Sequence, residues 1–580
     1  MYGFIGSFSF SGKNETELVC YKHNQTNLVA NSVEVDQLKL KRLSVDKFVN
    51  DKVFYEDEDV IIVIEGVIYN YSELEEKYAI NDRGKLLKTI HLELSTKGLA
   101  NILNGYYSGV IFNKSDGSLY LITDHITYKP LWYACFDETI YFSTDIDWLY
   151  RTLQENNIPL TLNLDGAYCL LNYGYMLGDV TPVNHVKKLI AGNIIFINDK
   201  NIKIESYYKI PEPNKSEEKF SEKEYSELLS KIDFAFKNSV NRVYQKDDEY
   251  GYRHCATLSG GLDSRLVVLT AAKLGYQTTC LTMGESKCPD IRISSKICND
   301  FCLEHIVYEL NNGLYLLDYD SAIIGNGGTI LSPGYLHSYR LKSLINLNIF
   351  GAIHSGDVGD AILGGSLLKY VNQKTISLTE AMYGSDFLDG FSKEFKDAET
   401  TRYIDQYQFN YYNRGLNSAG NGCIATQCYT ECSSPFIDKD LLDLMFSVPY
   451  GLVKDHKIYI DYIKNYLPEA CNYVWDGIGC KPGSSKFKKY IIFLLRAFRY
   501  KIKKNVVSMN PYEKWFSNNV ALSETFDKIL HTGEGIKENN TQLWKDLLKR
   551  YSSSRFMDKS LACTLIRLIQ IYDINVNACE

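Results

Sequence analysis

The chain has 580 residues, of which 45% are apolar and 23% charged, so it is long enough for several domains and has the composition of a folded globular protein. Its net charge is −8, from 63 basic and 71 acidic residues. This balance does not fit a general nucleic-acid binder, because such proteins are basic at the scale of a domain. The N-terminus lacks a secretory-signal pattern, and no apolar run approaches the roughly 18 residues needed for a membrane span. We therefore expect a cytoplasmic protein without a transmembrane segment.

Fifteen cysteines in a chain without an export signal are expected to be reduced thiols. Two groups are closely spaced: Cys298, Cys302 and His305, and the three cysteines between residues 423 and 432. Neither group contains a CxxC pair or a matching second half. We therefore favour buried or scattered thiols over a metal site.

The first two hundred residues are predicted to form a β-rich domain. Residues 60–64 are a continuous apolar run typical of a buried strand, and 110–112 and 119–122 flank an Asp-Gly turn. A capping-box pattern at 72–75 predicts the start of a short helix. Residues 194–204 predict a last hairpin.

A polar, proline-punctuated stretch at 211–219 has the composition of a connection between domains. Directly after it, Ser221 and Glu224 form a second capping-box pattern, followed by an amphipathic run. Strands then alternate with helical stretches before a mostly helical tail. We therefore expect a domain at 1–210, a linker at 211–225 and a second domain at 226–580 with a parallel α/β core.

The sharpest motif lies between a short apolar strand and an apolar helix. Its candidate ligand-binding residues are Leu258, Ser259, Gly260, Gly261, Asp263 and Ser264. The two glycines would let an anion approach the backbone, and a helix start supplies N–H groups and a positive dipole end. The loop lacks the lysine of GxxxxGKS loops, so a metal must neutralise more charge, and Asp263 is the obvious ligand. An ordinary glycine turn is the alternative.

The Ser-Gly-Gly-Leu-Asp-Ser motif resembles the ATP-pyrophosphatase signature of asparagine, GMP, NAD and argininosuccinate synthetases and of tRNA-thiolating enzymes. Those families split ATP between its α and β phosphates and pass the adenylyl group to a substrate oxygen. The resemblance implies that the loop binds the pyrophosphate of ATP.

A second segment, Ser355–Gly365, follows the strand expected at 349–354 and resembles the SGEGSDExFGGY segment of asparagine synthetases. The resemblance implies that Ser355 and Gly356 lie at the ATP site and that Asp360 joins Asp263 in holding Mg²⁺. Two carboxylates suit this ion, because Mg²⁺ prefers hard oxygen ligands. A turn aspartate that follows a glycine is the alternative for Asp360.

Three further matches follow in family order. Leu281–Gly284, which includes Met283, is similar to the strand that flanks the adenine, and Glu431–Asp438 resembles the ExRxPFLD segment. The loop at 475–483 is similar to the one that carries the family's catalytic lysine, which implies that Lys481 neutralises charge in the transition state. A solvent-facing lysine is the alternative.

The first half also resembles the asparagine synthetase group, so the resemblance covers nearly the whole chain. Glu65–Asn70 is similar to NGEIYN, and Asp124–Tyr133 to RDxxGxxPLYY. The implied fold is an antiparallel β-sandwich with flanking helices, of the N-terminal-nucleophile type. The family's nucleophilic cysteine is Tyr2 here, and a phenol is a poor nucleophile at neutral pH. Glu65 and Val67 also replace the asparagine and glutamate of NGE, so we expect a degenerate glutamine amidotransferase domain without glutaminase activity.

Relatives that lack the front cysteine include β-lactam synthetases and lasso-peptide macrolactam synthetases, in which an amine of the substrate itself closes a ring. Asp357 replaces the acid of SGE and is a candidate general base, although a structural carboxylate is nearly as good an interpretation. Ser433 stands where ExRxPFLD has arginine, which counts against aspartate as the substrate.

These resemblances imply an ATP- and Mg²⁺-dependent, AMP-forming amide-bond synthetase. Our specific expectation is ring closure on a precursor peptide, with that peptide and its leader-processing partner as partners. The alternatives are an ammonia-using amidotransferase acting on a sugar acid or small metabolite, and a catalytically silent binding or scaffold protein. The sequence specifies neither the acid, the amine nor the oligomeric state.

Residues 486–504 contain eight Lys or Arg and no acid, interleaved with apolar residues. Such a helix could bind an acidic peptide, a partner or an anionic membrane face. A packed helix with a solvated basic side is the alternative that the sequence favours.

Overall fold

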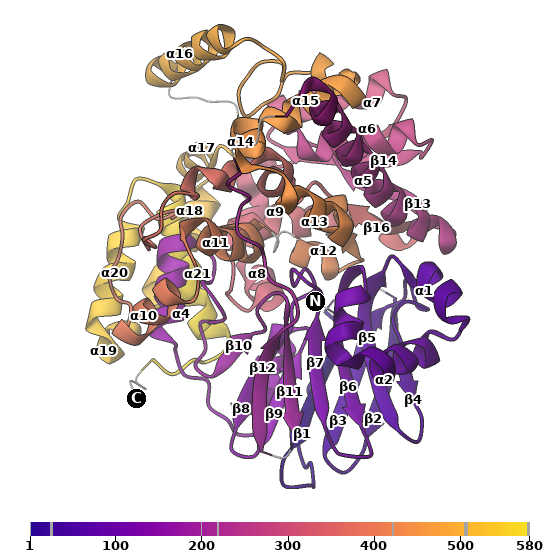
Figure 1. Cartoon of the computed structure of the whole chain (residues 1–580). Coiled ribbons are helices and arrows are strands. Elements are labelled where there is room, and N and C mark those ends of the chain that lie inside the picture. The colour runs from indigo at the N-terminus through magenta and orange to yellow at the C-terminus, as the bar shows by residue number, and fades with distance from the viewer. Residues whose placement is uncertain are drawn as a thin grey trace.

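A computed structural model describes residues 2–23, 27–198, 200–216, 220–419, 423–503 and 508–576. Two six-stranded antiparallel sheets make up the N-terminal half (Figure 1). The first sheet orders its strands β10-β8-β9-β1-β3-β2, namely Val186–Lys188, Trp132–Phe136, Thr139–Ser143, Gly3–Ser9, Leu38–Val45 and Leu28–Glu34. The second orders them β12-β11-β7-β6-β5-β4, namely Asn201–Ser206, Asn193–Asn198, Leu119–Thr123, Gly105–Asn113, Val60–Ile68 and Phe54–Glu56.

The run at 60–64 is apolar throughout because β5 is covered on both faces. Ile61 and Val63 lie in the core between the two sheets. Val60, Ile62 and Ile64 pack on the other side, in a core shared with helices α1, Tyr71–Tyr78, and α2, Arg83–Ile102. Strands buried on both faces lose the usual alternation of apolar and polar residues. The buried-strand prediction is confirmed, and so are the two hairpins: β6 pairs with β7, and β11 with β12.

A five-stranded parallel sheet forms the centre of the second half (Figure 1). Its order is β15-β14-β13-β16-β17, namely Glu304–Glu309, Thr278–Gly284, Arg253–Thr257, Phe350–His354 and Cys432–Ser433. The chain leaves β13 toward β14 on one side and later returns to add β16 on the other. The strand order therefore reverses at the β13–β16 pair, and open parallel sheets bind ligands at the carboxyl ends of such a pair.

The predicted helical tail is present, and it packs against the first half. Before the tail, the helices of the second half include α5, Glu222–Glu249; α6, Asp263–Lys273; α7, Pro289–Asp300; α8, Tyr319–Asn326; α9, Ser332–Ser343; α10, Lys393–Thr401; α11, Gln406–Asn410; α12, Ile424–Gln427; α13, Lys439–Ser447; α14, Tyr450–Val453; and α15, Lys457–Tyr466. The tail comprises α16, Lys486–Lys503; α17, Tyr512–Asn518; α18, Val520–Thr532; α19, Ile536–Asn539; α20, Thr541–Tyr551; and α21, Phe556–Ile571. One buried cluster joins α21 to α3, Ile146–Glu155, and α4, Leu164–Tyr173, so the two halves share a core.

The two capping-box predictions had different outcomes. Ser221 caps α5: its side chain accepts from the Glu224 N–H, and the Glu224 side chain accepts from the Ser221 N–H. The pattern at 72–75 was wrong, because α1 starts earlier, with Asn70 at its N-cap and Ser72 inside the helix. Residues 211–221 of the predicted linker lie between β12 and α5, residues 222–225 already belong to α5, and residues 217–219 are outside the described part.

No disulfide joins any of the described cysteines, as expected for reduced thiols. Neither cysteine group brings three candidate metal-ligand atoms within 4.8 Å of one another among the described residues. Cys302 is exposed, and His305 contacts the Thr282 hydroxyl at 2.9 Å. Within the described ranges, no helix has both the length and the apolar character needed to traverse a bilayer.

Candidate active site

The two glycine-rich motifs meet at the carboxyl ends of β13 and β16. His354, the last residue of β16, pairs with Ala256 of β13, so the loops that follow leave the sheet side by side. A Cβ on Gly356 would lie 2.4 Å from the Ser264 nitrogen, and a Cβ on Gly359 would lie 2.8 Å from the Asp263 Cβ. The glycines thus allow the backbone after β16 to lie directly against the start of α6.

This contact brings Asp263 and Asp360 together, as the sequence predicts. Burial, and after it the charge of Asp360, raise the pKa of Asp263 to about 7. The Tyr459 hydroxyl donates to Asp263 Oδ1 at 2.8 Å, and His456 Nε2 lies 2.6 Å from Asp360 Oδ1. Burial opposes ionisation of Asp360, but hydrogen bonds from His456 and Ser366 hold its pKa below the usual value. Two adjacent carboxylates of this kind would be relieved by a divalent cation.

His456 and Tyr459 are site residues that the sequence analysis missed. Asp455 and His456 both adopt left-handed backbone conformations, with φ of 57° and 61°, in the turn that leads into α15. This turn aims the imidazole at Asp360, and the Trp475 ring packs edge-on against it at 5.0 Å. A lone histidine before an amphipathic helix carries no local signal of this role.

The loop after β13 is held in shape by its own side chains. Ser264 Oγ accepts from the Ser259 N–H at 3.1 Å, and Ser259 Oγ accepts from the Gly261 N–H at 3.2 Å. The Gly260 N–H donates to Asp290 Oδ1 at 3.0 Å, so that amide is committed to the protein. A Cβ on Gly261 would meet only Ser259 Oγ, at 3.2 Å, and would otherwise project into open space. Gly261 therefore leaves room for an anion.

A buried arginine ties this loop to the segment after α15. Arg265 donates to the Gly260 carbonyl at 3.1 Å and to the carbonyls of Ala470 and Val474 at 3.0 and 2.7 Å. Burial lowers its pKa to about 10. Leu258 lies beside β14, the strand that contains Met283: its N–H donates to the Leu281 carbonyl at 2.9 Å.

Asp263 and Asp360 form the wall between two cavities. The larger has a volume of about 800 Å³ and is lined mostly by residues of the second domain, with Asp357, Lys369 and Arg414 as its other charged residues. Arg414 belongs to a π-helical segment, Tyr411–Ala419, and its guanidinium lies 4.6 Å from the centre of the Tyr383 ring. The two cations could hold an anionic group of a substrate.

The second cavity, of about 540 Å³, lies on the side of the loop after β13. Gly261, His456 and Trp475 line it, and so does Lys489 at the start of α16. Lys481 is exposed and lines neither of these two cavities. Its catalytic role stays a prediction, while Lys489 in this cavity and Lys369 in the larger one are lysines that line the cavities beside the two carboxylates.

Asp357 receives a hydrogen bond from the N-terminal half. The Tyr128 hydroxyl donates to Asp357 Oδ2 at 3.2 Å and lies 3.5 Å from Ser355 Oγ. Burial raises the pKa of Asp357, and the hydrogen bonds from Ser355 and Tyr128 oppose this rise. A partly exposed carboxylate that lines the larger cavity and has a raised pKa is suited to accept a proton. Ser433, by contrast, is buried and contacts His354 Nδ1 at 2.8 Å, away from that cavity.

Four buried charges connect the two halves next to this site. Lys52 Nζ lies 2.7 Å from Glu431 and 3.6 Å from Glu65, and Lys129 Nζ lies 3.2 Å from Glu65 and 3.6 Å from Glu431. Burial opposes the ionisation of Glu65, but Lys129 and Lys52 hold its pKa below the usual value. Glu65, which replaces the asparagine of NGE, is therefore part of a link between the halves. We call these residues the charge quartet.

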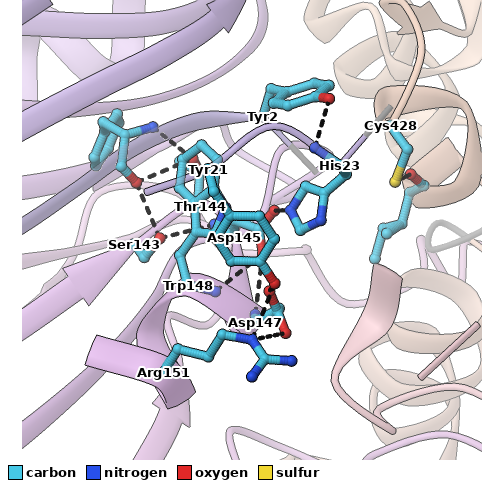
Figure 2. A network of polar contacts seen from close by, with 12 residues as sticks. Tyr2, Tyr21, His23, Ser143, Thr144, Asp145, Asp147, Trp148, Arg151 and Cys428 are labelled. Carbon is cyan, nitrogen blue, oxygen red and sulfur yellow. Dashed lines mark hydrogen bonds and ion pairs between the residues drawn. The ribbon is translucent and has the colours of Figure 1, made fainter. Parts of the chain in front are cut away.

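Figure 2 shows the surroundings of Tyr2. The Tyr2 side chain is buried, packs against Trp148 and accepts from the His23 N–H at 3.1 Å. His23 Nε2 lies 3.0 Å from Asp145 Oδ2, and its ring stacks on Trp148. Asp147 Oδ1 accepts from Tyr572 at 2.7 Å, so this network also reaches the C-terminal tail. A ring and a packed network thus occupy the position of the family's nucleophile.

Comparisons with known proteins agree with this arrangement of two parts. Residues 27–208 match the glutamine amidotransferase domain family and residues 231–459 match the asparagine synthase family. The chain is 25% identical to asparagine synthetase (glutamine-hydrolyzing) 1 of Bacillus subtilis (strain 168), over 56% of this chain and 51% of that protein. It is 24% identical to the "Probable asparagine synthetase (glutamine-hydrolyzing)" of Acanthamoeba polyphaga mimivirus, over 71% of this chain and 70% of that one. The alignment with the Bacillus subtilis protein thus spans about half of that protein's length.

Proposed function

The chain is an asparagine synthetase-like protein, and we propose that it is an AMP-forming amide-bond synthetase that makes no use of glutamine. The observation that carries this proposal is the convergence of Asp263 and Asp360 from two separate strand ends onto one wall of two cavities. Both residues stand in motifs that resemble the ATP-pyrophosphatase signature and its asparagine synthetase partner segment.

Mg²⁺ and ATP fit the residues present. The two carboxylates supply hard oxygen ligands, and the burial and the charge of Asp360 that raise the pKa of Asp263 both favour a bound cation. Mg²⁺ held there would neutralise the pyrophosphate that leaves when a carboxylate is adenylated. The open space beside Gly261 and the N-terminus of α6 receive the phosphates, and Lys489 adds a positive charge on the same cavity.

The larger cavity would then hold the acid and the attacking amine. Asp357 lies on its wall and would take the proton that the amine releases as the amide bond forms. Tyr128 orients this carboxylate through its hydrogen bond to Oδ2. Lys369 and Arg414 are placed to bind a negatively charged part of the substrate.

Two observations support a substrate that brings its own amine. Tyr2 replaces the nucleophile, and its ring is packed among buried residues; Glu65 is held in the charge quartet instead of a glutamine site. A cavity of about 800 Å³ is near the upper end of the range for small-molecule sites, which suits a peptide segment better than aspartate. We therefore propose ring closure on a peptide precursor, as in macrolactam synthetases.

A second candidate is transfer of free ammonia to a sugar acid or small metabolite. The pair of cations in the larger cavity favours it, because an anionic acid would find both Lys369 and Arg414 there. The two candidates share the adenylation step and differ only in the amine.

The test is release of pyrophosphate and AMP from ATP with panels of peptides and of sugar acids, each with and without ammonia or glutamine. We expect release that needs the acid, survives without glutamine and is lost in both Asp263→Asn and Asp360→Asn. Turnover that depends on free glutamine would contradict the proposal. An absence of AMP with every mixture, together with intact ATP binding, would instead support a silent binding protein.

A further inference from the structure

Helix α16 exposes an apolar face to solvent. Figure 1 shows this helix at the edge of the molecule, beyond α15. Its exposed apolar side chains recur at steps of three and four residues and are Phe487, Tyr490, Ile491, Leu494 and Leu495. Phe487 is 74% exposed, Tyr490 60% and Leu495 51%. Residues with this spacing lie on one side of a helix, so they form one continuous strip, which we call the apolar strip.

Two basic residues of α16 face the protein. Arg496 donates to the Gly477 carbonyl at 3.3 Å and lies 3.4 Å from Asp476, and Lys489 lines the second cavity. The helix therefore contacts the rest of the protein through these two cations, and its apolar strip faces solvent. This arrangement is the opposite of the one that the sequence favours. The sequence favours a packed helix with a solvated basic side, because a surface helix normally buries its apolar side.

The charge around the strip is of one sign. Residues 477–512 contain nine Lys or Arg and no Asp or Glu, in a chain whose net charge is −8. Lys488 is exposed and follows the strip residue Phe487. An apolar strip bordered by basic residues is the pattern of helices that lie in the plane of a membrane surface. The acidic remainder of the chain would be repelled by an anionic surface, so this helix would be the part that approaches it.

A protein partner fits the strip less well. Lysine is depleted in the cores of protein interfaces, whereas anionic lipid headgroups attract each Lys or Arg near the surface. We propose that α16 docks the protein on an anionic membrane surface, with the apolar strip inserted among the headgroups and the cations beside it paired with lipid phosphates. The docking would leave the second cavity on the protein side of the helix.

The test is co-sedimentation of the full-length protein with vesicles made of equal parts phosphatidylglycerol and phosphatidylcholine, and with vesicles of phosphatidylcholine alone. We expect binding to the anionic vesicles, little binding to the neutral ones, and a decrease with added salt. Phe487→Ser should weaken binding about tenfold, because it removes one buried ring from the bilayer surface. Lys488→Gln should weaken it about fivefold.

Phe234 of α5 supplies a matched control, because its ring is 69% exposed on a different helix. Phe234→Ser should leave vesicle binding unchanged, and both serine variants should keep the circular dichroism spectrum of the parent. Equal binding of Phe487→Ser and the parent protein would overturn the proposal. So would a parent protein that ignores both kinds of vesicle but forms a dimer that Phe487→Ser dissociates, since the strip would then be covered by a second copy.

Discussion

The contact between Tyr128 and Asp357 makes a residue of the N-terminal half a positioning residue for the synthetase site. Tyr128→Phe removes one hydroxyl and leaves the ring packed edge-on against Tyr106. A hydrogen bond to a charged group contributes about 1.5 to 3 kcal/mol. At 3.2 Å this one is longer than most O–H···O bonds, so the low end of the range applies. We expect an approximately tenfold loss in the rate of amide formation.

The loss should depend on the step and on the pH. Adenylation needs no base at Asp357, so ATP–pyrophosphate exchange and the KM for ATP should stay near the parent values. The hydrogen bond from Tyr128 favours the ionised carboxylate, so its removal raises the pKa of Asp357 further above the ordinary value. A base works only when it is deprotonated, and the acidic limb of the amide-formation profile should therefore move to higher pH.

Tyr107→Phe is the matched control for this change. Tyr107 is buried in the same half, donates to the Ala100 carbonyl at 3.0 Å and lies in the core that β5 and β6 share with α1 and α2. It should lose stability without a shift of the pH profile. If Tyr128→Phe lowers adenylation and amide formation equally at every pH, Tyr128 has only a structural role and the reasoning fails.

Three further predictions test other parts of the structure. Lys489→Met should lower ATP–pyrophosphate exchange at least about tenfold, the cost of losing a charge at a pyrophosphate, whereas Lys481→Met should have the smaller effect; the opposite order would restore Lys481 as the catalytic lysine. Lys52→Met removes one cation from the charge quartet and leaves Glu431 undercompensated, so urea unfolding should show a loss of about 3 to 5 kcal/mol; a loss under about 1 kcal/mol would mean that water reaches the quartet. Burial raises the pKa of Glu399 from 4.5 to about 7, so the folded chain keeps a proton that the unfolded chain has released, and stability falls as pH rises through this window. Glu399→Gln should therefore be more stable than the parent by about 3 kcal/mol at pH 8 and no more stable at pH 4; an equal gain at both pH values would assign the effect to packing.

The sequence predicted those features that depend on neighbouring residues. The buried run of β5, the hairpins and the Ser221 cap follow from local pattern, and the structure contains them. The cap at 72–75 failed because α1 begins one residue before Ser72, although the predicted short helix itself is present. Asn70 takes the N-cap position of α1, and its amide is used on the Ile102 carbonyl instead of the helix, which no pattern within four residues could indicate.

The sequence predicted the site residues that stand in a motif and missed those that only the tertiary fold brings to the site. Asp263 and Asp360 follow recognisable loops, but their contact depends on β16 inserting beside β13, a strand order that the sequence does not state. His456, Tyr128 and Lys489 reach the site from three distant segments, through a left-handed turn, a contact between halves and a projecting helix. Each residue type is ordinary in its own segment, so only the tertiary arrangement identifies it.

The N-terminal half makes buried polar contacts that hold strands of the second half in place. Lys47 crosses from that half and donates to the Phe350 carbonyl at 2.6 Å and to Thr430 Oγ1 at 2.7 Å, at the start of β16 and just before β17. The charge quartet fixes Glu431, two residues before Ser433, in the same way. Tyr128 then acts on Asp357 itself. Deleting this half would leave buried charges without partners beside the two strands that set the position of the synthetase loops, and an unpaired buried charge is strongly destabilising. On the proposed function, a front domain that does not activate glutamine would therefore still be required for the geometry of the reaction next to it.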